Sequence, residues 1–255
     1  MARLEVGGGR VEGNGPLRRF IIPSTTAKSY ADAQWFDYQG LRRSKFPHRA
    51  PFRFSLRARF SHEADQIGGT AGFGLWNDPF TLSGGGVLAA PNTIWFFAAS
   101  PPNDQYLCDG VPGRGWKAAA LNTGGYPPLM VMPGAAAAVL LTRIPGLGRP
   151  IMKMARRMIT ASERLLEVRM RDWHDYAFDW RDGSAVFRVD GVEVLRADSP
   201  PAGPLGLVIW IDNQYAIASE TGQFKFGLIA HLEERWMEIE ALTIHDQQID
   251  ATTVS

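Results

Sequence analysis

Cysteine, net charge and long apolar runs are almost absent from this chain of 255 residues. Its one cysteine, Cys108, can form no disulfide within the chain, so cysteine content does not indicate an oxidising compartment. The 27 basic and 26 acidic side chains leave a net charge of +1, which gives no overall attraction for nucleic acid. The most apolar stretch, residues 135–141, falls far short of the roughly 18 residues that cross a bilayer, and residues 1–15 lack the apolar segment of a secretory signal. We therefore expect a cytoplasmic protein with no transmembrane helix and no nucleic-acid partner.

The residues that are abundant describe a folded protein made of short elements. Hydrophobic residues make up 45% of the chain and aromatic residues 11%, which is enough for a substantial core. The 27 glycines and 17 prolines interrupt the sequence at short intervals, as is typical of an all-β domain with many turns. We interpret residues 1–20 as an N-terminal arm and residues 21–255 as a single β-sandwich domain.

Hydrophobic periodicity locates several strands. From Phe52 to Phe60, apolar residues alternate with arginine and serine, which predicts a strand with one buried face. Three further strands are predicted at 173–180, 185–189 and 192–195. The Asp190-Gly191 pair between the last two is a strong hairpin signal.

Two other segments, Thr93–Ala99 and Leu205–Ile211, are apolar at nearly every position. A strand that is apolar on both sides is usually covered on both sides, so we expect both segments to be central strands, one in each sheet. Together these patterns predict an all-β fold in which two antiparallel sheets pack as a sandwich.

An insertion at residues 127–164 breaks the strand pattern. After Pro150, residues Ile151, Met154 and Met158 recur at helical spacing with basic residues on the other faces, which predicts a short helix over 150–163. Three roles are compatible with it. The insertion could be a lid over the ligand site, a weak contact with a membrane surface, or a cover for the sandwich or a homodimer contact.

Two motifs on the predicted strands point to a known family. Residues 173–180 read W-H-D-Y-A-F-D-W and lead into V-D-G-V-E-V at 189–194, while the Phe52–Phe60 strand is followed by G-F-G-L-W at 72–76. With residues 236–244, these segments resemble the concanavalin A-like lectin/glucanase superfamily, and specifically the family 16 glycoside hydrolases. The resemblance implies a jelly-roll sandwich of two antiparallel sheets that binds ligands on its concave face.

The catalytic motif of that family, E-x-D-x-x-E or a one-residue variant, is missing where the resemblance places it. The matching strand is Thr93–Ala99, and residues 79–103 contain no Asp or Glu. Retaining hydrolysis requires one carboxylate as nucleophile and one carboxylic acid as proton donor. We therefore do not expect the usual family 16 mechanism, and the sequence leaves open whether the protein is an enzyme.

Polar side chains beside aromatic ones, at the ends of apolar strands, are the candidates for ligand binding. Aromatic faces stack on sugar rings, while amides and carboxylates bond to the hydroxyl groups. The predicted ligand-binding residues are Trp76, Asn77, Asp78, Trp95, Trp210, Asp212, Asn213 and Tyr215. The weaker candidates for acid or base catalysis are Asp212, Asp78 and His174. Turn formation is the alternative role for the Asn-Asp pairs, and a structural hydrogen bond is the alternative for His174.

The five histidines show no spacing typical of a metal site, so neither a metal nor a cofactor is expected. The sequence thus favours a carbohydrate- or small-ligand-binding protein on a hydrolase-like scaffold that lacks the usual catalytic carboxylates. The alternative is an intracellular enzyme with non-standard acid–base chemistry on an enclosed, partly apolar or glycosidic substrate.

Overall fold

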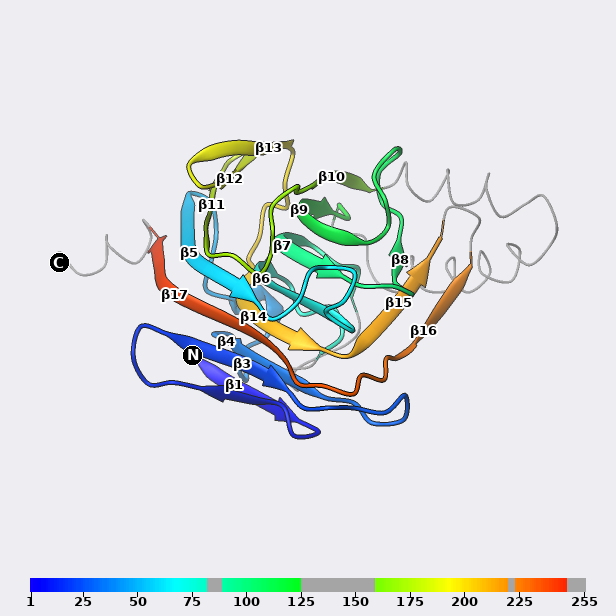
Figure 1. The fold of residues 1–255 in the computed structure, drawn as a ribbon. Coiled ribbons are helices and arrows are strands. Elements are labelled where there is room, and N and C mark those ends of the chain that lie inside the picture. Colours follow the sequence, from blue (N-terminus) through cyan, green and yellow to red (C-terminus); the bar gives the residue numbers. More distant parts are fainter. Residues whose placement is uncertain (82–88, 125–158, 220–222, 247–255) are drawn as a thin grey trace.

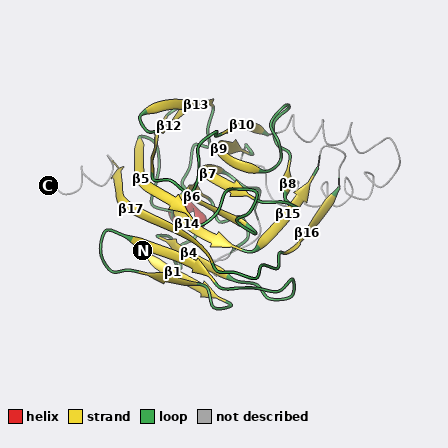
Figure 2. Cartoon of the chain, viewed as in Figure 1, coloured by secondary structure: helices red, strands yellow, loops and turns green. Residues whose placement is uncertain are grey.

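The computed structural model describes residues 1–81, 89–124, 159–219 and 223–246. Two antiparallel sheets of seven strands each face one another, as the ribbon in Figure 1 shows. Within the described residues the only helical element is a single short turn at Arg43–Lys45, and strands dominate the cartoon in Figure 2. This architecture confirms the predicted all-β jelly-roll sandwich.

The first sheet has the strand order β1-β4-β14-β6-β7-β9-β10. In that order its strands span Ala2–Val6, Asp32–Phe36, Gly206–Asp212, Thr70–Trp76, Thr93–Ala99, Gly115–Asn122 and Thr160–Leu165. The second sheet has the order β13-β12-β11-β5-β17-β3-β2. Its strands span Val192–Asp198, Ser184–Val189, His174–Arg181, Phe52–Phe60, Arg235–Asp246, Arg18–Ile22 and Arg10–Glu12. A small third sheet joins β16 (Phe224–Leu228), β15 (Gln214–Ala218) and β8 (Asp104–Gln105).

The strands predicted from strict alternation are confirmed. β5 coincides with Phe52–Phe60, and it pairs with β11 on one side and β17 on the other. β12 and β13 form the expected hairpin. Its two turn residues, Asp190 and Gly191, have φ angles of 51° and 79°, and a turn with positive φ at both central positions matches the twist of the flanking strands.

One prediction about the two apolar strands is wrong. β7 and β14 are both central, but both lie in the first sheet instead of one in each sheet. The physical reason is that this sheet is covered on both faces. Its inner side chains join the core of the sandwich, and its outer side chains form a second buried aromatic cluster.

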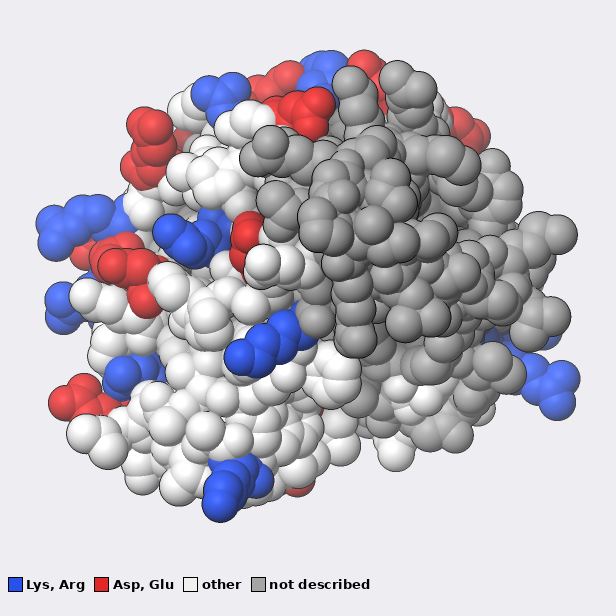
Figure 3. All heavy atoms as spheres, turned by 90° about the vertical axis from the view of Figure 1, so that its right-hand side faces the viewer, with Lys and Arg blue, Asp and Glu red and all other residues white. Residues whose placement is uncertain are grey.

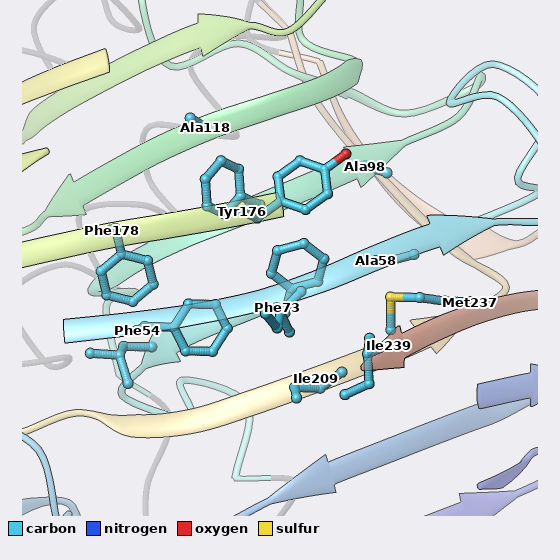
Figure 4. Packing of buried hydrophobic residues seen from close by; sticks show 14 of the residues in the cluster. Phe54, Ala58, Phe73, Ala98, Ala118, Tyr176, Phe178, Ile209, Met237 and Ile239 are labelled. Atoms are coloured by element: carbon cyan, nitrogen blue, oxygen red, sulfur yellow. The ribbon is translucent and has the colours of Figure 1, made fainter. Parts of the chain in front are cut away.

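The main core lies between the sheets and is strongly aromatic. Figure 4 shows Phe54 of β5, Phe73 of β6 and Phe178 of β11 pointing toward one another from opposite sheets. The rings of Phe54 and Phe178 stack at 4.9 Å, and Tyr176 lies 5.2 Å from Phe73. These side chains are completely buried, so the alternation that the sequence displays is the direct consequence of one core-facing side on each strand.

The segment expected to be an N-terminal arm contributes strands to both sheets, because β1 pairs with β4 and β2 pairs with β3. The predicted lid and most of the predicted helix fall on residues 125–158, outside the described residues. The end of the helix prediction is wrong, since Thr160–Leu165 forms β10 and pairs with β9. Nothing in the described residues therefore supports a membrane contact through a helix at 150–163.

Among the described residues, no helix has the length and apolar character needed to span a membrane. Figure 3 shows one face of the molecule, on which basic and acidic side chains of the described residues lie interspersed. The described surface on this face carries no broad patch of one sign.

Candidate functional site

The outer face of the first sheet carries a cluster of large aromatic side chains, which we call the tryptophan face. Alternation along β14 produces it. Leu207, Ile209 and Ile211 point into the core, while Val208, Trp210 and Asp212 lie on the opposite side. The residues of this second cluster are Phe36, Tyr38, Phe46, Trp76, Phe97, Ala99, Val208 and Trp210, with Trp95 packed against them.

The three tryptophans come from three neighbouring strands and lie close together. Trp76 and Trp210 are nearly parallel, with an interplanar angle of 6° and ring centroids 6.3 Å apart. Trp95 lies 5.3 Å from Trp210, and it stacks at 5.2 Å on Phe97. Trp76, Trp210 and Phe97 are buried, whereas Trp95 is only partly buried. Trp95 is therefore the ring of this cluster most available for contact with another molecule.

Two glycines of β6 make room for these rings. A Cβ atom on Gly72 would lie 2.9 Å from the Trp210 ring and 2.3 Å from the backbone oxygen of Phe96. A Cβ atom on Gly74 would lie 2.7 Å from that of Trp95. The G-F-G spacing thus places one phenylalanine in the core and two bare backbone positions under the indoles.

Buried hydroxyl groups fix the two inner indoles. The Nε1 of Trp76 donates to the Tyr38 hydroxyl at 2.6 Å, and the Nε1 of Trp210 donates to Oγ1 of Thr70 at 3.0 Å. An indole N–H that is buried requires such an acceptor. The rings are therefore held in one orientation by the protein itself.

A pair of buried carboxyl groups lies at one end of the tryptophan face. Asp32 begins β4, Asp212 ends β14, and the two are direct cross-strand partners, with Thr70 of β6 next in the same row. Directly opposed residues have Cβ atoms about 4.5–5.5 Å apart. The sheet register therefore brings together two acids that are 180 positions apart in the sequence.

Asp212 is well provided with hydrogen bonds. Its Oδ1 accepts from Thr70 Oγ1 at 2.8 Å, from the Thr70 backbone N–H at 3.2 Å and from the Gln214 N–H at 3.0 Å. Burial raises the pKa of Asp212 to about 6, and these donors partly oppose the increase. Asp212 is thus anchored in the framework of the sheet, at the edge of the aromatic cluster.

Asp32 has no comparable support. It is 1% exposed, and neither carboxyl oxygen receives a hydrogen bond of acceptable geometry. Burial raises the pKa of Asp32 well above its usual range, the nearby Asp212 raises it further, and the neighbouring Tyr30 hydroxyl opposes the increase. Sequence analysis missed Asp32. The alternation of Asp32, Gln34 and Phe36 in β4 indicates that Asp32 faces the same side of the sheet as Phe36. This local pattern does not contain the register that pairs Asp32 with Asp212.

A buried ion pair lies at the other end of the tryptophan face. Nζ of Lys117 on β9 is 3.3 Å from Oε2 of Glu163 on β10, and the two side chains are 2% and 4% exposed. Phe97 on β7 is the cross-strand partner of Lys117. The face therefore combines an apolar centre with ionisable groups at both ends.

Several predicted ligand-binding residues have structural partners. The Asn77 side chain donates a hydrogen bond to the Ala90 carbonyl at 2.9 Å and accepts one from the Asn92 N–H at 3.0 Å. Asn213 is fully buried, and its amide bonds to three backbone groups of two segments, at residues 29–31 and at Ile229. Asp78 is buried with a φ of 44°, and its carbonyl accepts from Arg43.

The other two candidates lie away from the three tryptophans. Tyr215 is on β15 of the third sheet, with the Lys225 ammonium 5.9 Å from its ring. His174 is on β11 of the second sheet. Its Nδ1 lies 2.6 Å from Oδ2 of Asp190 in the hairpin turn, and its ring packs against Tyr176. The structure therefore brings together Trp76, Trp95, Trp210 and Asp212, but not His174.

Another buried ionisable group, the His48 imidazole, is not part of the tryptophan face. The His48 ring bridges Oδ2 of Asp37 at 2.6 Å and Oδ2 of Asp246 at 3.1 Å. Burial alone would lower its pKa, but the hydrogen bonds and charges of these carboxyls outweigh burial and raise the pKa of His48. This bridge links the segment after β4 to the end of β17.

No group of three or more His, Cys, Asp or Glu side chains suited to a metal ion occurs among the described residues. The tryptophan face combines the partly buried ring of Trp95 with the buried polar side chains of Asp32, Asp212 and Thr70.

Comparison with known proteins gives structural matches only. No family model and no curated protein matches the sequence. A laminarinase from Flavobacterium sp. UMI-01 is 9% identical with a TM-score of 0.45, over 92% of this chain and 81% of the laminarinase. The kappa-carrageenase zobellia_236 from Zobellia galactanivorans is 10% identical with a TM-score of 0.47, over 93% of this chain and 81% of the other. The alginate lyase AlyC3 is 8% identical with a TM-score of 0.44, over 90% and 74% of the two chains. At this distance the matches do not identify what the protein does.

Proposed function

We propose that the tryptophan face binds a carbohydrate and that the protein does not hydrolyse it by the usual family 16 mechanism. The observation that carries the proposal is the placement of Trp95 beside two fixed indoles and, at one end of the same face, two carboxyl groups. Sugar recognition combines a flat aromatic surface with a few polar groups that reach the ring hydroxyls.

The outward positions of β7 support the second half of the proposal. They are Thr93, Trp95, Phe97 and Ala99, and the sequence resemblance places the three carboxylates of the catalytic motif on this strand. None of these four side chains carries a carboxyl group that could act as the nucleophile or as the proton donor of retaining hydrolysis. A binding role therefore accounts for β7 better than retaining hydrolysis does.

Titration of the protein with neutral, amino and acidic oligosaccharides by calorimetry tests the binding proposal. Trp95→Ala should raise the dissociation constant about tenfold, because stacking on one aromatic ring contributes on the order of 1 kcal/mol to binding. Trp236→Ala is the matched control. Trp236 is also partly buried, but it lies on the second sheet under the guanidinium groups of Arg19 and Arg59.

Binding that survives Trp95→Ala unchanged, or no binding of any oligosaccharide, would contradict the proposal. Incubation with mixed-linkage, β-1,3 and galactan substrates should release no reducing ends. Turnover that depends on a single acidic residue would overturn the statement about mechanism.

A further inference from the structure

We infer that Asp32 is a ligand-binding residue and that, with Asp212, it selects neutral or amino sugars over acidic ones. Neutral and amino sugars can donate hydrogen bonds from hydroxyl or ammonium groups to these two carboxyl groups. This inference rests on the proposed function, because it names the polar end of the same site. It adds a residue that sequence analysis did not identify and a class of ligand.

The first support is the scarcity of hydrogen-bond partners at Asp32. A buried carboxyl group normally has its oxygens occupied, and leaving it without donors is costly in free energy. Neither buried oxygen of Asp32 has a well-formed hydrogen bond, and a single neighbouring donor, the Tyr30 hydroxyl, lies beside the carboxyl group. The side chain nevertheless lies on the same face as Trp210 and Asp212. A bound group that donates hydrogen bonds would satisfy this side chain.

The second support is the contrast with other buried or half-buried acids of the protein. Asp212 has three donors on one oxygen. Asp179 on β11 is bonded to the guanidinium groups of Arg53 and Arg188. The framework therefore surrounds these two acids with several donors, whereas beside Asp32 it places only the Tyr30 hydroxyl.

The third support is the charge of the face. Its ionisable groups include the phenols of Tyr30 and Tyr38 and the acidic Asp32, Asp212 and Glu163. Lys117 is already paired with Glu163. A uronate or sulfate group at the Asp32 end would lie beside Asp212 in a desolvated place and would find no free cation among the described residues of the face. Like charges in such surroundings repel strongly. Hydroxyl or ammonium groups would meet acceptors there.

The test uses the whole protein and three probes of similar length, and it measures dissociation constants by calorimetry at pH 7. Laminarihexaose is the neutral probe, a glucosamine hexamer is the amino probe and hexamannuronate is the acidic probe. The neutral or the amino probe should bind at least about tenfold more tightly than the acidic one. Equal affinity of the first two indicates recognition through hydroxyl groups, and preference for the glucosamine hexamer indicates recognition through an ammonium group.

Two variants assign this selectivity to Asp32. Asp32→Leu removes both acceptors and should weaken binding about tenfold, with a melting temperature equal to or above that of the wild type because an unsatisfied buried group is removed. Asp32→Asn keeps the shape and one acceptor oxygen and replaces the other oxygen with an NH2 donor. It should therefore weaken chiefly the binding of an ammonium-bearing ligand. Asp179→Asn is the control, and it should lower the melting temperature without changing the dissociation constants.

The outcomes separate this inference from the function on which it rests. Binding that requires Trp95 but is unchanged in Asp32→Leu would overturn the inference and leave the proposed function intact. A lower melting temperature of Asp32→Leu with unchanged affinity would mean that a buried water alone satisfies Asp32. Hexamannuronate that binds the wild type as tightly as the other probes would overturn the inference even if Asp32→Leu did not fold. Absence of binding by all three probes would refute the proposed function itself.

Discussion

The buried ion pair between Lys117 and Glu163 makes the sharpest prediction about stability. The two side chains come from adjacent strands, β9 and β10, and are 2% and 4% exposed, so water does not replace a partner that is lost. Removal of one member of a buried pair costs about 3–5 kcal/mol, because the other charge remains buried alone. Lys117→Met should therefore lower the free energy of unfolding by about this amount, which corresponds to a decrease of roughly 10 °C in the melting temperature.

Replacement of both members should be far less damaging than replacement of one. In Lys117→Met/Glu163→Leu no charge is left buried, and apolar side chains of similar volume fill the same space. The double variant should lie within about 1 kcal/mol of the wild type. The difference between the double variant and the sum of the two single variants gives the coupling energy directly.

Urea denaturation at pH 7, followed by tryptophan fluorescence, measures these four proteins. The control is Arg196→Met, since Arg196 and Glu193 form an exposed pair at 2.8 Å whose side chains are 55% and 41% exposed. Loss of an exposed pair costs less than about 1 kcal/mol. A cost below about 1 kcal/mol for Lys117→Met, or strictly additive losses in the double variant, would refute the reasoning from burial.

Two further predictions concern pH and packing. The raised pKa of His48 means that its contribution to stability is fully present below the unfolded-state value of 6.5 and is lost as pH rises through the folded-state pKa. Between about pH 5.5 and about pH 8.5, the melting temperature should thus fall less in His48→Gln than in the wild type. His62→Gln is the control. Because the pKa of His62 is lowered in the folded protein, this variant should not reduce the fall of the melting temperature. Gly72→Ala should destabilise the protein by about 1–3 kcal/mol and change its tryptophan fluorescence, because a Cβ there would lie 2.3 Å from the Phe96 carbonyl oxygen. Gly15→Ala, with nothing within 4 Å, should melt like the wild type, and equal melting temperatures for both alanine variants would contradict the packing argument.

The sequence by itself determined several strands and the class of fold. Alternation from Phe52 to Phe60 and the Asp190-Gly191 turn are local properties, because side-chain direction reverses at every strand residue and the turn needs two residues that accept positive φ. Two apolar runs identified Trp95 and Trp210 as strand residues. The run Thr93–Ala99 coincides with β7, whereas the run Leu205–Ile211 lies one residue before β14 at each end.

Only the tertiary structure decided which strands lie side by side, and with them the composition of the site. Sheet membership of β7 and β14 depends on long-range pairing, and the sequence placed these strands in different sheets although both belong to the first. Asp32 and Asp212 become neighbours through the register of β4 against β14, which no local pattern contains. His174 shows the converse. It was a weak catalytic candidate with a structural hydrogen bond as the alternative. Its strand pairs with β5 and β12 in the second sheet, away from the tryptophan face, and its Nδ1 lies 2.6 Å from Oδ2 of Asp190.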